Sequence, residues 1–495
     1  MKILLIHPPF YRFIGYYNRY FPLGLASLAA VLRQKGHEVL VCDADYNENP
    51  SKMDFTRLEE DYLIYLSALK NNANPVWREI KNVISGFRPD LVGITVWTTF
   101  AASSFKVAQI CKQYNADMPV VFGGPHSTIK YDEVMRICPD VDIIVRGEGE
   151  NTILELAEKL QHTNRVEDVK GIVYRQNGNV INNTEREFIN DLDVLPFADR
   201  EVLLNKKTYN SEDMGLMMTS RGCPYTCSYC ATSIWKRKIR YRSIDNVIEE
   251  IKLVRGRYGT QQFTFKDDSF TVNRKRIMEF CDRLINENID INWDCNTRVN
   301  LIDEEMLSRM KRAGCNSIKI GIETGSERIL GLINKGTTLS QARIAAKLLR
   351  KAGIHWTAYF MIGLPSETKK EIYETLNFLN ELKPDFASLS IYEPFPGTEL
   401  FEFGIEKGLV QRERTMKDFY TISPKYYYVK DTSRRIDTMD TAEFEKLEAE
   451  MKRKFHKYNM GFSKLLKRGV SRSKLYLNEP KALLADVRKF RSWVK

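Results

Sequence analysis

The sequence predicts an α/β protein with two successive series of alternating strands and helices, followed by a helical, basic C-terminal region. Short apolar runs alternate with amphipathic stretches of helical length through residues 1–165, and the alternation resumes over residues 206–400. A chain of 495 residues also exceeds the size of a single ordinary core. We therefore expect two α/β domains at these positions, a connector at 166–205 and a helical domain at 401–495.

The first series has the pattern of a doubly wound, Rossmann-like domain. Helical stretches such as Leu23–Lys35 and Ala102–Gln113 separate its strands. The expected strands are Lys2–Ile6, Glu38–Cys42, Leu91–Thr95, Val120–Phe122 and Asp142–Val145. Ligands of such sheets lie beyond the carboxyl ends of the strands. In the connector, Asn177-Gly178-Asn179 between two apolar runs predicts a β-hairpin.

The second series contains about six strand–helix units. Strands are expected at Leu216–Thr219, Gln262–Lys266, Ile291–Cys295, Ser317–Ile322, Trp356–Ile362 and Phe386–Ile391. Helices are expected at Asp245–Tyr258, Arg274–Asn286, Glu304–Ala313 and Leu339–Ala352. Eight units close a complete barrel, so six predict a partial, open (β/α)6 barrel.

Six of the nine cysteines are scattered singly through apolar or helical stretches, where reduced core thiols are expected. They are Cys42, Cys111, Cys138, Cys281, Cys295 and Cys315. An odd count without an export signal argues against a disulfide framework. The sequence contains no apolar run of about 20 residues and no signal-peptide pattern, so we expect a cytoplasmic protein.

The other three cysteines, Cys223, Cys227 and Cys230, lie together in Gly222–Cys230. Three thiolates on one loop can ligate three irons of a [4Fe-4S] cluster and leave the fourth iron open. The alternative is a structural zinc site, which needs four ligands and usually a second cysteine pair. No second pair exists, and His126 and His355 are distant in sequence, so the cluster is favoured.

The C-x-x-x-C-x-x-C spacing directly after the first strand of a βα series, with Tyr229 before the last cysteine, strongly resembles the radical S-adenosylmethionine superfamily. The resemblance covers about residues 216–400. It implies that the methionyl amino and carboxylate groups of S-adenosylmethionine chelate the open iron. An external reductant then supplies one electron, which cleaves the sulfonium to methionine and a 5′-deoxyadenosyl radical.

The same resemblance implies an S-adenosylmethionine site at the other strand ends. Asp268, in Phe265–Phe270, stands where many members carry Gly-Gly-Glu for the methionyl amino group; a helix N-cap is the alternative. Arg298 is expected either at the methionyl carboxylate or in a surface salt bridge. Glu323 is expected to make a polar contact, Gly363 to contact adenine through its backbone, and Tyr229 to line the site.

Several short motifs in order resemble the cobalamin-binding subgroup of that superfamily. They are Pro22–Leu25, Gly123–His126, Arg146–Glu150, Phe265–Asp268 and Pro396–Thr398. This implies a corrin site at the strand ends of the first domain, formed by His7, Thr95, Trp97, Thr98, Gly123, Gly124, His126, Gly147 and Glu148. The Asp-x-His-x-x-Gly motif that supplies a lower cobalt ligand elsewhere is missing, so no cobalt ligand is assigned.

Alternatives stay open at these positions. His7 is favoured as a packing residue over a ligand, and Trp97 as a core residue over a cover for the corrin face. His126 is a candidate contact for the nucleotide tail of the corrin. The whole domain is alternatively a relic that binds nothing.

The formal charge of +11 lies in the tail, because residues 452–495 contain 14 Lys and Arg against two acids. Residues 480–494 predict a basic amphipathic helix. Such a helix either contacts anionic lipid at the inner membrane surface or packs on the barrel with a solvated basic side. A nucleic-acid partner is not expected, because no recognition module accompanies the charge.

Together these features predict a cobalamin-dependent enzyme that methylates an unactivated carbon. The deoxyadenosyl radical would abstract hydrogen, the substrate radical would take a methyl group from methylcobalamin, and a second S-adenosylmethionine would restore that methyl group. Cyclisation or rearrangement without methyl transfer is the alternative, followed by a non-catalytic corrin- or cluster-binding protein. The substrate remains open between a small molecule, a lipid and a peptide.

Overall fold

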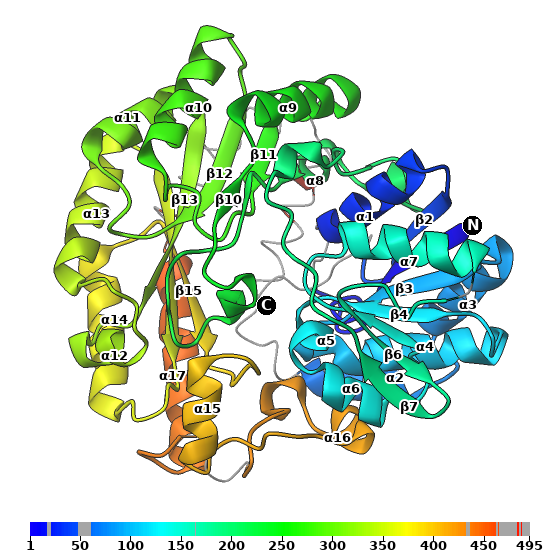
Figure 1. Cartoon of the computed structure of the whole chain (residues 1–495). Coiled ribbons are helices and arrows are strands. Elements are labelled where there is room, and N and C mark those ends of the chain that lie inside the picture. Colours follow the sequence, from blue (N-terminus) through cyan, green and yellow to red (C-terminus); the bar gives the residue numbers. More distant parts are fainter. Residues whose placement is uncertain are drawn as a thin grey trace. The chain divides into compact units, whose positions relative to one another are not determined.

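The computed structural model describes residues 1–16, 21–47, 61–163, 165–431 and 436–461, together with 464, 483, 484 and 487. The chain forms two compact units (Figure 1). The first unit contains Met1–Met214 and Arg412–Tyr428, and the second contains Gly215–Gln411 and Val429–Lys495. Each unit is built around its own large sheet.

The first unit has a seven-stranded sheet in the order β2-β1-β3-β4-β5-β6-β7. Its strands are β1 Lys2–His7, β2 Glu38–Asp43, β3 Leu91–Thr95, β4 Val120–Gly123, β5 Ile143–Val145, β6 Ile172–Gln176 and β7 Asn179–Asn182. The first five strands run parallel, and β6 and β7 are antiparallel. All five strands predicted in the first series are therefore confirmed.

Helices cover both faces of this sheet, which confirms the doubly wound prediction. The helices of the first unit are α1 Leu23–Gln34, α2 Tyr62–Lys70, α3 Pro75–Phe87, α4 Ala101–Tyr114, α5 Pro125–Ile129, α6 Tyr131–Ile137, α7 Glu150–His162, α8 Ser211–Met214 and α16 Met416–Thr421. Helix α1 packs against α7, and α3 packs against α4. Because βαβ connections are right-handed and the strand order reverses at β1, these two pairs lie on opposite faces.

The segment after α7 covers both edges of the first sheet. The β6–β7 hairpin pairs with β5 at one edge. At the other edge, Val41 of β2 donates its N–H to the carbonyl of Val202 at 2.9 Å and accepts from the N–H of Leu204 at 2.9 Å. Covered edges prevent the sheet from pairing with other chains.

The second unit has a six-stranded, fully parallel sheet in the order β15-β14-β13-β12-β11-β8. Its strands are β8 Leu216–Met217, β11 Gln262–Phe265, β12 Asn292–Thr297, β13 Cys315–Glu323, β14 His355–Ile362 and β15 Phe386–Ile391. Strands β8 and β15 lie at opposite ends of the order, so the sheet stays open. The predicted partial (β/α)6 barrel is confirmed.

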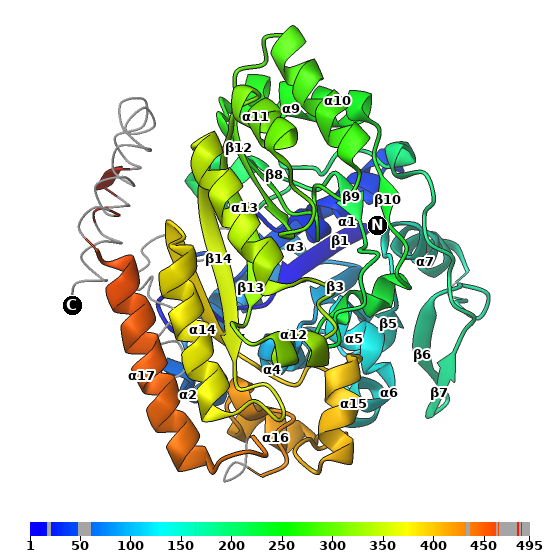
Figure 2. The same cartoon turned by 90° about the vertical axis from the view of Figure 1, so that its left-hand side faces the viewer.

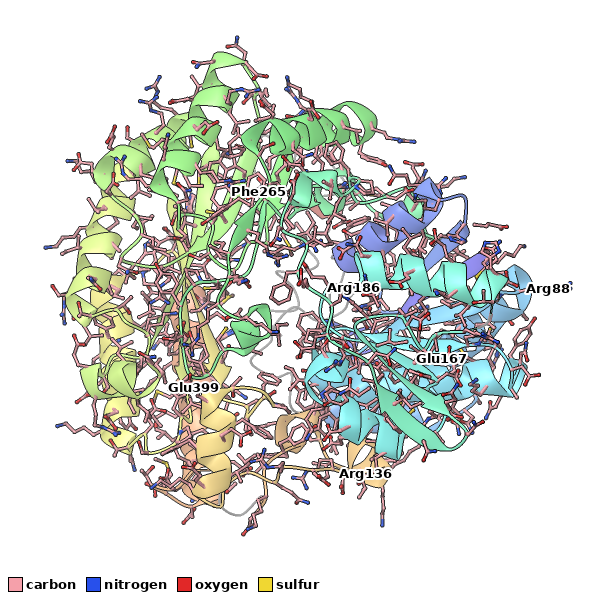
Figure 3. The ribbon with its side chains drawn as sticks, viewed as in Figure 1. Arg88, Arg136, Glu167, Arg186, Phe265 and Glu399 are labelled. Carbon is pink, nitrogen blue, oxygen red and sulfur yellow. The ribbon has the colours of Figure 1, made fainter. Side chains whose placement is uncertain are left out.

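One face of this sheet is packed against helices (Figures 1 and 2). They include α9 Ile244–Tyr258, α10 Arg274–Asn286, α11 Glu304–Arg312, α12 Glu327–Leu332, α13 Leu339–Ala352 and α14 Lys369–Leu382. Phe265 of β11, labelled in Figure 3, contacts Phe280 of α10 with ring centroids 5.5 Å apart. Because side chains alternate along a strand, the residues on either side of Phe265 face the opposite, concave side.

The C-terminal helices are α15 Glu399–Glu406 and α17 Thr441–Asn459. Asn459 of α17 accepts from the N–H of Ala387 at 2.9 Å and donates to its carbonyl at 2.7 Å, which covers the β15 edge. None of the helices that the structure describes is both long and apolar enough to cross a membrane. The helix predicted at 480–494 lies outside the described residues, apart from 483, 484 and 487.

Candidate cluster and cofactor sites

The three clustered cysteines lie on a loop between two short paired strands, β9 Ser220–Arg221 and β10 Arg240–Tyr241. Asp267, at the end of β11, anchors the start of this loop. Its buried carboxylate accepts from the N–H of Thr219 at 2.6 Å, the Thr219 hydroxyl at 2.5 Å and the Ser220 hydroxyl at 2.8 Å. The sequence analysis singled out Asp268 and missed this role for its neighbour.

Cys223, Cys227 and Cys230 are free, partly exposed thiols, whereas the six scattered cysteines are all buried and free as predicted. In the described ranges, no three His, Cys, Asp or Glu side chains converge as they would around one ion. In a four-iron cluster each thiolate takes a different iron, so three separate thiols on one loop fit that group.

Arg298 follows β12 and reaches the cysteine loop. Its Nη1 donates to Cys227 Sγ at 3.3 Å, and its guanidinium lies 3.8 Å from the ring centre of Tyr225. Nη2 donates to the carbonyl of Lys335. Arg298 is only 6% exposed, so the alternative of a surface salt bridge is wrong. Its Nε has no partner among the described residues and is a donor in reach of the loop.

Glu323, Tyr229 and Lys335 form a polar triad in which Glu323 and Lys335 are buried and Tyr229 is partly buried. The Tyr229 hydroxyl donates to Glu323 Oε1 at 2.8 Å, and Lys335 Nζ donates to the same oxygen at 2.6 Å. Lys335 Nζ also lies 3.0 Å from the Tyr229 hydroxyl. Burial and the charge of Glu323 raise the pKa of Tyr229, so the phenol remains a neutral donor. Lys335 was not predicted, because it lies at no strand end.

The segment Leu332–Lys335, which we call the strap, fixes the middle of the cysteine loop. The N–H of Ser228 donates to the carbonyl of Ile333 at 2.9 Å, and the Ser228 hydroxyl donates to the carbonyl of Leu332 at 3.2 Å. Asn334 Nδ2 donates to Thr226 Oγ1 at 2.8 Å. These bonds join residues more than 100 positions apart, so no local sequence pattern predicts them.

Asp268 is exposed beside the buried Asp267. Desolvation and the charge of Asp267 raise the pKa of Asp268 to about 6. Helix α10 is capped by Asn273, whose side chain accepts from the N–H of Arg276 at 3.1 Å. The N-cap alternative for Asp268 is therefore wrong. The charge of Asp268 also acts on Cys223, where burial is the larger reason that the thiol pKa is raised.

Gly363, after β14, has a positive φ of 82°, and a Cβ there would lie 2.7 Å from the ring of Phe444. Its N–H donates to Glu367 Oε2 at 2.6 Å, and the N–H of Leu364 donates to the same oxygen at 3.2 Å. Glu367 is fully buried, and burial raises its pKa to about 8. The amide of Gly363 is thus occupied within the protein.

At the strand ends of the first unit, His126 Nδ1 lies 3.1 Å from Thr98 Oγ1. His126 is 1% exposed, and its Nε2 has no partner in the part of the chain that the structure describes. Burial lowers the pKa of His126 to about 3, so the ring is neutral. The rings of Phe419 and Tyr428 lie 5.9 Å and 6.5 Å away.

Phe419 and Tyr428 belong to the segment Arg412–Tyr428, which we call the clasp. Figure 1 shows its helix, α16, in orange with the first unit. The buried carboxylate of Glu133 holds the clasp: it accepts from the Tyr428 hydroxyl at 2.7 Å and from the N–H of Arg414 at 3.1 Å. Lys130 Nζ pairs with the same carboxylate at 3.1 Å.

Two glycines and an exposed tryptophan lie at the carboxyl ends of β3 and β4. A Cβ on Gly124 would lie 2.9 Å from the carbonyl of Val96, while one on Gly123 would meet nothing within 4 Å. Trp97 is 51% exposed, so the favoured interpretation of a core residue is wrong. Thr95, at the end of β3, accepts through its carbonyl from the Ser104 hydroxyl at 2.9 Å.

The remaining strand-end residues have partners inside the first unit. His7 packs edge-on against Phe100 with ring centroids 5.3 Å apart. Gly147 donates its N–H to Thr128 Oγ1 at 3.2 Å. Glu148 is buried and accepts from the N–H of Ile189 at 2.8 Å, which holds the connector. Three features at the carboxyl ends of these strands fit a large, partly polar ligand. The His126 Nε2 has no hydrogen-bond partner among the described residues, there is free space beside Gly123, and the Trp97 side chain is exposed.

Comparison with known proteins identifies both domains. Residues 217–379 match the radical SAM superfamily, and residues 14–157 match the B12 binding domain. An uncharacterized methyltransferase of Pyrococcus horikoshii is 35% identical over 445 residues, covering 89% of this chain and 90% of that protein. An anaerobic magnesium-protoporphyrin IX monomethyl ester cyclase of Rubrivivax gelatinosus is 30% identical over 416 residues, covering 81% and 70%.

A solved structure of the radical S-adenosylmethionine methyltransferase TsrM from Kitasatospora setae, with cobalamin and a [4Fe-4S] cluster bound, has a similar fold. The TM-score is 0.63 at 17% identity, covering 86% of this chain and 81% of that chain. The matches to the two family models confirm both halves of the prediction, the radical S-adenosylmethionine barrel and the cobalamin-binding domain. The chain belongs to the cobalamin-binding radical S-adenosylmethionine enzymes.

Proposed function

We propose that this enzyme transfers a methyl group to an unactivated carbon of its substrate, with cobalamin as the methyl carrier. One observation supports this most: three free thiols share a loop beside a parallel barrel strand, in a chain that also contains a cobalamin-binding fold. Relatives named as methyltransferases support it further.

In this proposal Cys223, Cys227 and Cys230 hold the cluster. With an electron from an external reductant, the bound cofactors supply a carbon-centred radical from S-adenosylmethionine and a methyl group from the corrin. The protein positions these groups and excludes water from them.

For S-adenosylmethionine, we assign the exposed carboxylate of Asp268 to the methionyl amino group and the Nε of Arg298 to the methionyl carboxylate. We assign the Gly363 backbone to adenine through its carbonyl, because its N–H is bonded to Glu367. Tyr229 and Glu323 line the site, and the bonds of both to Lys335 set their positions.

For the corrin, we assign the exposed indole of Trp97 to the ring face and the Nε2 of His126 to a polar group of the nucleotide tail. The other proposed contacts are His7, Thr95, Thr98, Gly123, Gly124, Gly147 and Glu148. No residue is assigned as a cobalt ligand.

The test is anaerobic product analysis with cluster, cobalamin and a chemical reductant, using a Cys223→Ser, Cys227→Ser, Cys230→Ser variant as the control. Methyl transfer requires both 5′-deoxyadenosine and S-adenosylhomocysteine, and neither forms in the variant. The relatives named as cyclases support a second candidate, a rearrangement or cyclisation without methyl transfer. That reaction yields 5′-deoxyadenosine without S-adenosylhomocysteine.

The basic tail supports a separate proposal of peripheral contact with anionic membrane, which rests on sequence only. Full-length protein and a form truncated after residue 461 would be sedimented with vesicles containing anionic lipid. Stronger partitioning of the full-length protein is expected, and equal partitioning contradicts the proposal.

A further inference from the structure

The loop that carries the three cysteines closes on a very short ladder, which we call the loop base. Strands β9 and β10 pair there over two residues each. The N–H of Arg242 adds one bond to the carbonyl of Thr219 at 3.0 Å. Because an isolated two-stranded ladder is marginally stable in water, the position of the loop base depends on the side chains that anchor it.

Arg276, on α10, contacts both strands of the loop base. Its Nη2 donates to the carbonyl of Thr219 at 3.3 Å and to the carbonyl of Arg242 at 3.0 Å. Its guanidinium also lies 5.2 Å from the ring centre of Tyr241. One side chain therefore joins the segment that enters the cysteine loop to the segment that leaves it.

A hydroxyl group links Arg276 to the carboxylate of Asp267. The Thr219 hydroxyl accepts from Arg276 Nη1 at 3.3 Å and donates to Asp267 Oδ2 at 2.5 Å. Both charged side chains are buried. The shared hydroxyl thus places a buried cation near a buried anion, and each lowers the cost of burying the other.

Arg276 lies where a helix does not favour a cation. It is in the first turn of α10, which Asn273 caps. The first turn of a helix has a partial positive charge, and burial removes the hydration of the guanidinium. Neither condition stabilises Arg276, so its bonds to the loop base account for its position.

The same network fixes the segment that contains Asp268. The Asp267 carboxylate is bonded to Thr219, and the Asp267 carbonyl accepts from Asn296 Nδ2 at 3.4 Å. The N–H of Phe270 donates to the carbonyl of Asn296 at 2.9 Å. This segment is therefore attached both to the loop base and to β12, with Asp268 exposed on it.

The three cysteines depend on different anchors. Arg298 donates to Cys227 Sγ at 3.3 Å. Tyr229, which precedes Cys230, is bonded to the other members of the polar triad. Cys223 lies two residues beyond the end of β9, so the loop base sets its position.

We propose that Arg276 is a positioning residue of the cluster site. Through Thr219 and Asp267, it holds the end of the loop that carries Cys223. Because Asp268 follows Asp267, the same bonds hold the ligand that we assign to the methionyl amino group in a fixed position relative to that loop. The role of Asp268 rests on the proposed function, whereas the link from Arg276 to the loop base does not.

The test compares enzyme samples that are loaded with cluster and matched for iron content. Calorimetry without reductant gives the Kd for S-adenosylmethionine. Electron paramagnetic resonance of the reduced cluster, with and without S-adenosylmethionine, gives the change in g values on binding. A residue with a merely structural role would alter stability and iron uptake, but it would leave both properties of the loaded enzyme unchanged.

Arg276→Met should raise this Kd by about threefold or more, because Asp268 loses its fixed position relative to the cluster. The change in g values should become smaller or more heterogeneous. Arg274→Met, in the same helical turn but in an exposed ion pair with Asp303, is the matched control and should equal the wild type.

Two further variants show whether the effect passes through the hydroxyl group. Thr219→Val should also raise the Kd, and the double variant Arg276→Met, Thr219→Val should bind no more weakly than the weaker single variant. Arg276→Lys keeps the charge but lacks the planar fork, so its Kd should lie between those of the wild type and Arg276→Met. If Arg276→Met takes up too little iron, Thr219→Val and Arg276→Lys provide the same comparison.

Unchanged Kd and g values in these iron-matched variants overturn the proposal. Additive effects in the double variant also overturn it, since the two residues would then act separately. The measurements need no methyl acceptor, so 5′-deoxyadenosine without S-adenosylhomocysteine in the product assay would refute methyl transfer and leave the role of Arg276. A wild-type protein that assembles no cluster would overturn the cluster assignment and this role together.

Discussion

The guanidinium of Arg298 lies 3.3 Å from the sulfur of Cys227, and both belong to the cluster end of the barrel. A charged N–H donor therefore contacts this cysteine sulfur directly. The same side chain bonds the carbonyl of Lys335, so it joins the cysteine loop to the strap. This contact connects β12 to the loop that carries the cysteines.

Replacing Arg298 should weaken S-adenosylmethionine binding. Arg298→Met removes a charged donor, which costs about tenfold or more in Kd. It should also make the midpoint potential of the cluster more negative, because a nearby positive charge is lost. Calorimetry and potentiometry of loaded protein measure the two effects. Arg274→Met, at an exposed ion pair with Asp303, should match the wild type; an unchanged Kd in Arg298→Met contradicts the assignment.

Lys335→Met should reduce the iron content reached on reconstitution. The change leaves the buried Glu323 carboxylate without its cation, and breaking a buried pair costs about 3–5 kcal/mol. The double variant Lys335→Met, Glu323→Gln should recover part of this loss. Urea unfolding and iron and sulfide analysis provide the measurements. Equal values for the single and double variants would show that the two residues are not coupled.

Breaking the contact between Tyr428 and Glu133 should loosen the clasp. Tyr428→Phe removes a donor from a buried carboxylate, at a cost of about 1–3 kcal/mol. Amide hydrogen exchange over residues 412–428 should accelerate. The Kd for hydroxocobalamin should also change, because the clasp packs against His126, which we assign to the corrin. Arg136→Ala, which removes an exposed ion pair with Glu413, is the matched control on the same segment. Identical exchange in both variants would contradict a locking role for Glu133.

Stability of the second unit should fall as pH rises toward 8. Burial raises the pKa of Glu367 from 4.5 to about 8, so the folded state holds a proton that the unfolded chain releases. That contribution is complete below about pH 4.5 and declines by at most about 1.4 kcal/mol per pH unit until the pH passes 8. Glu367→Gln should flatten this slope in urea unfolding, while Glu374→Gln should keep it. If the unfolding free energy of Glu367→Gln depends on pH as steeply as that of the wild type, the prediction is refuted.

The local sequence pattern was sufficient to predict the strands of the two sheets. Runs such as Ile3–Ile6 and Ile318–Ile322 predict buried parallel strands because their apolar content and length suit little else. The spacing of Cys223, Cys227 and Cys230 predicted the cluster loop, since the chemistry requires three thiolates on one short segment. The sequence by itself therefore determined the fold class and the order of the two domains, and it singled out the three cysteines that we propose as cluster ligands.

Only the tertiary structure decided which distant residues the side chains of the two sites contact. Periodicity indicates the face on which a side chain lies, but it does not indicate what packs there from a distant part of the chain. Glu133 bonds Arg414 from 281 residues away, and Lys335 reaches back 106 residues to Tyr229. Trp97 looked like a core residue by type, yet it lies exposed, two residues beyond the end of its strand at Thr95. These long-range hydrogen bonds and charge pairs form only after the chain has closed such long loops, so the strap and the clasp appear only in the folded molecule.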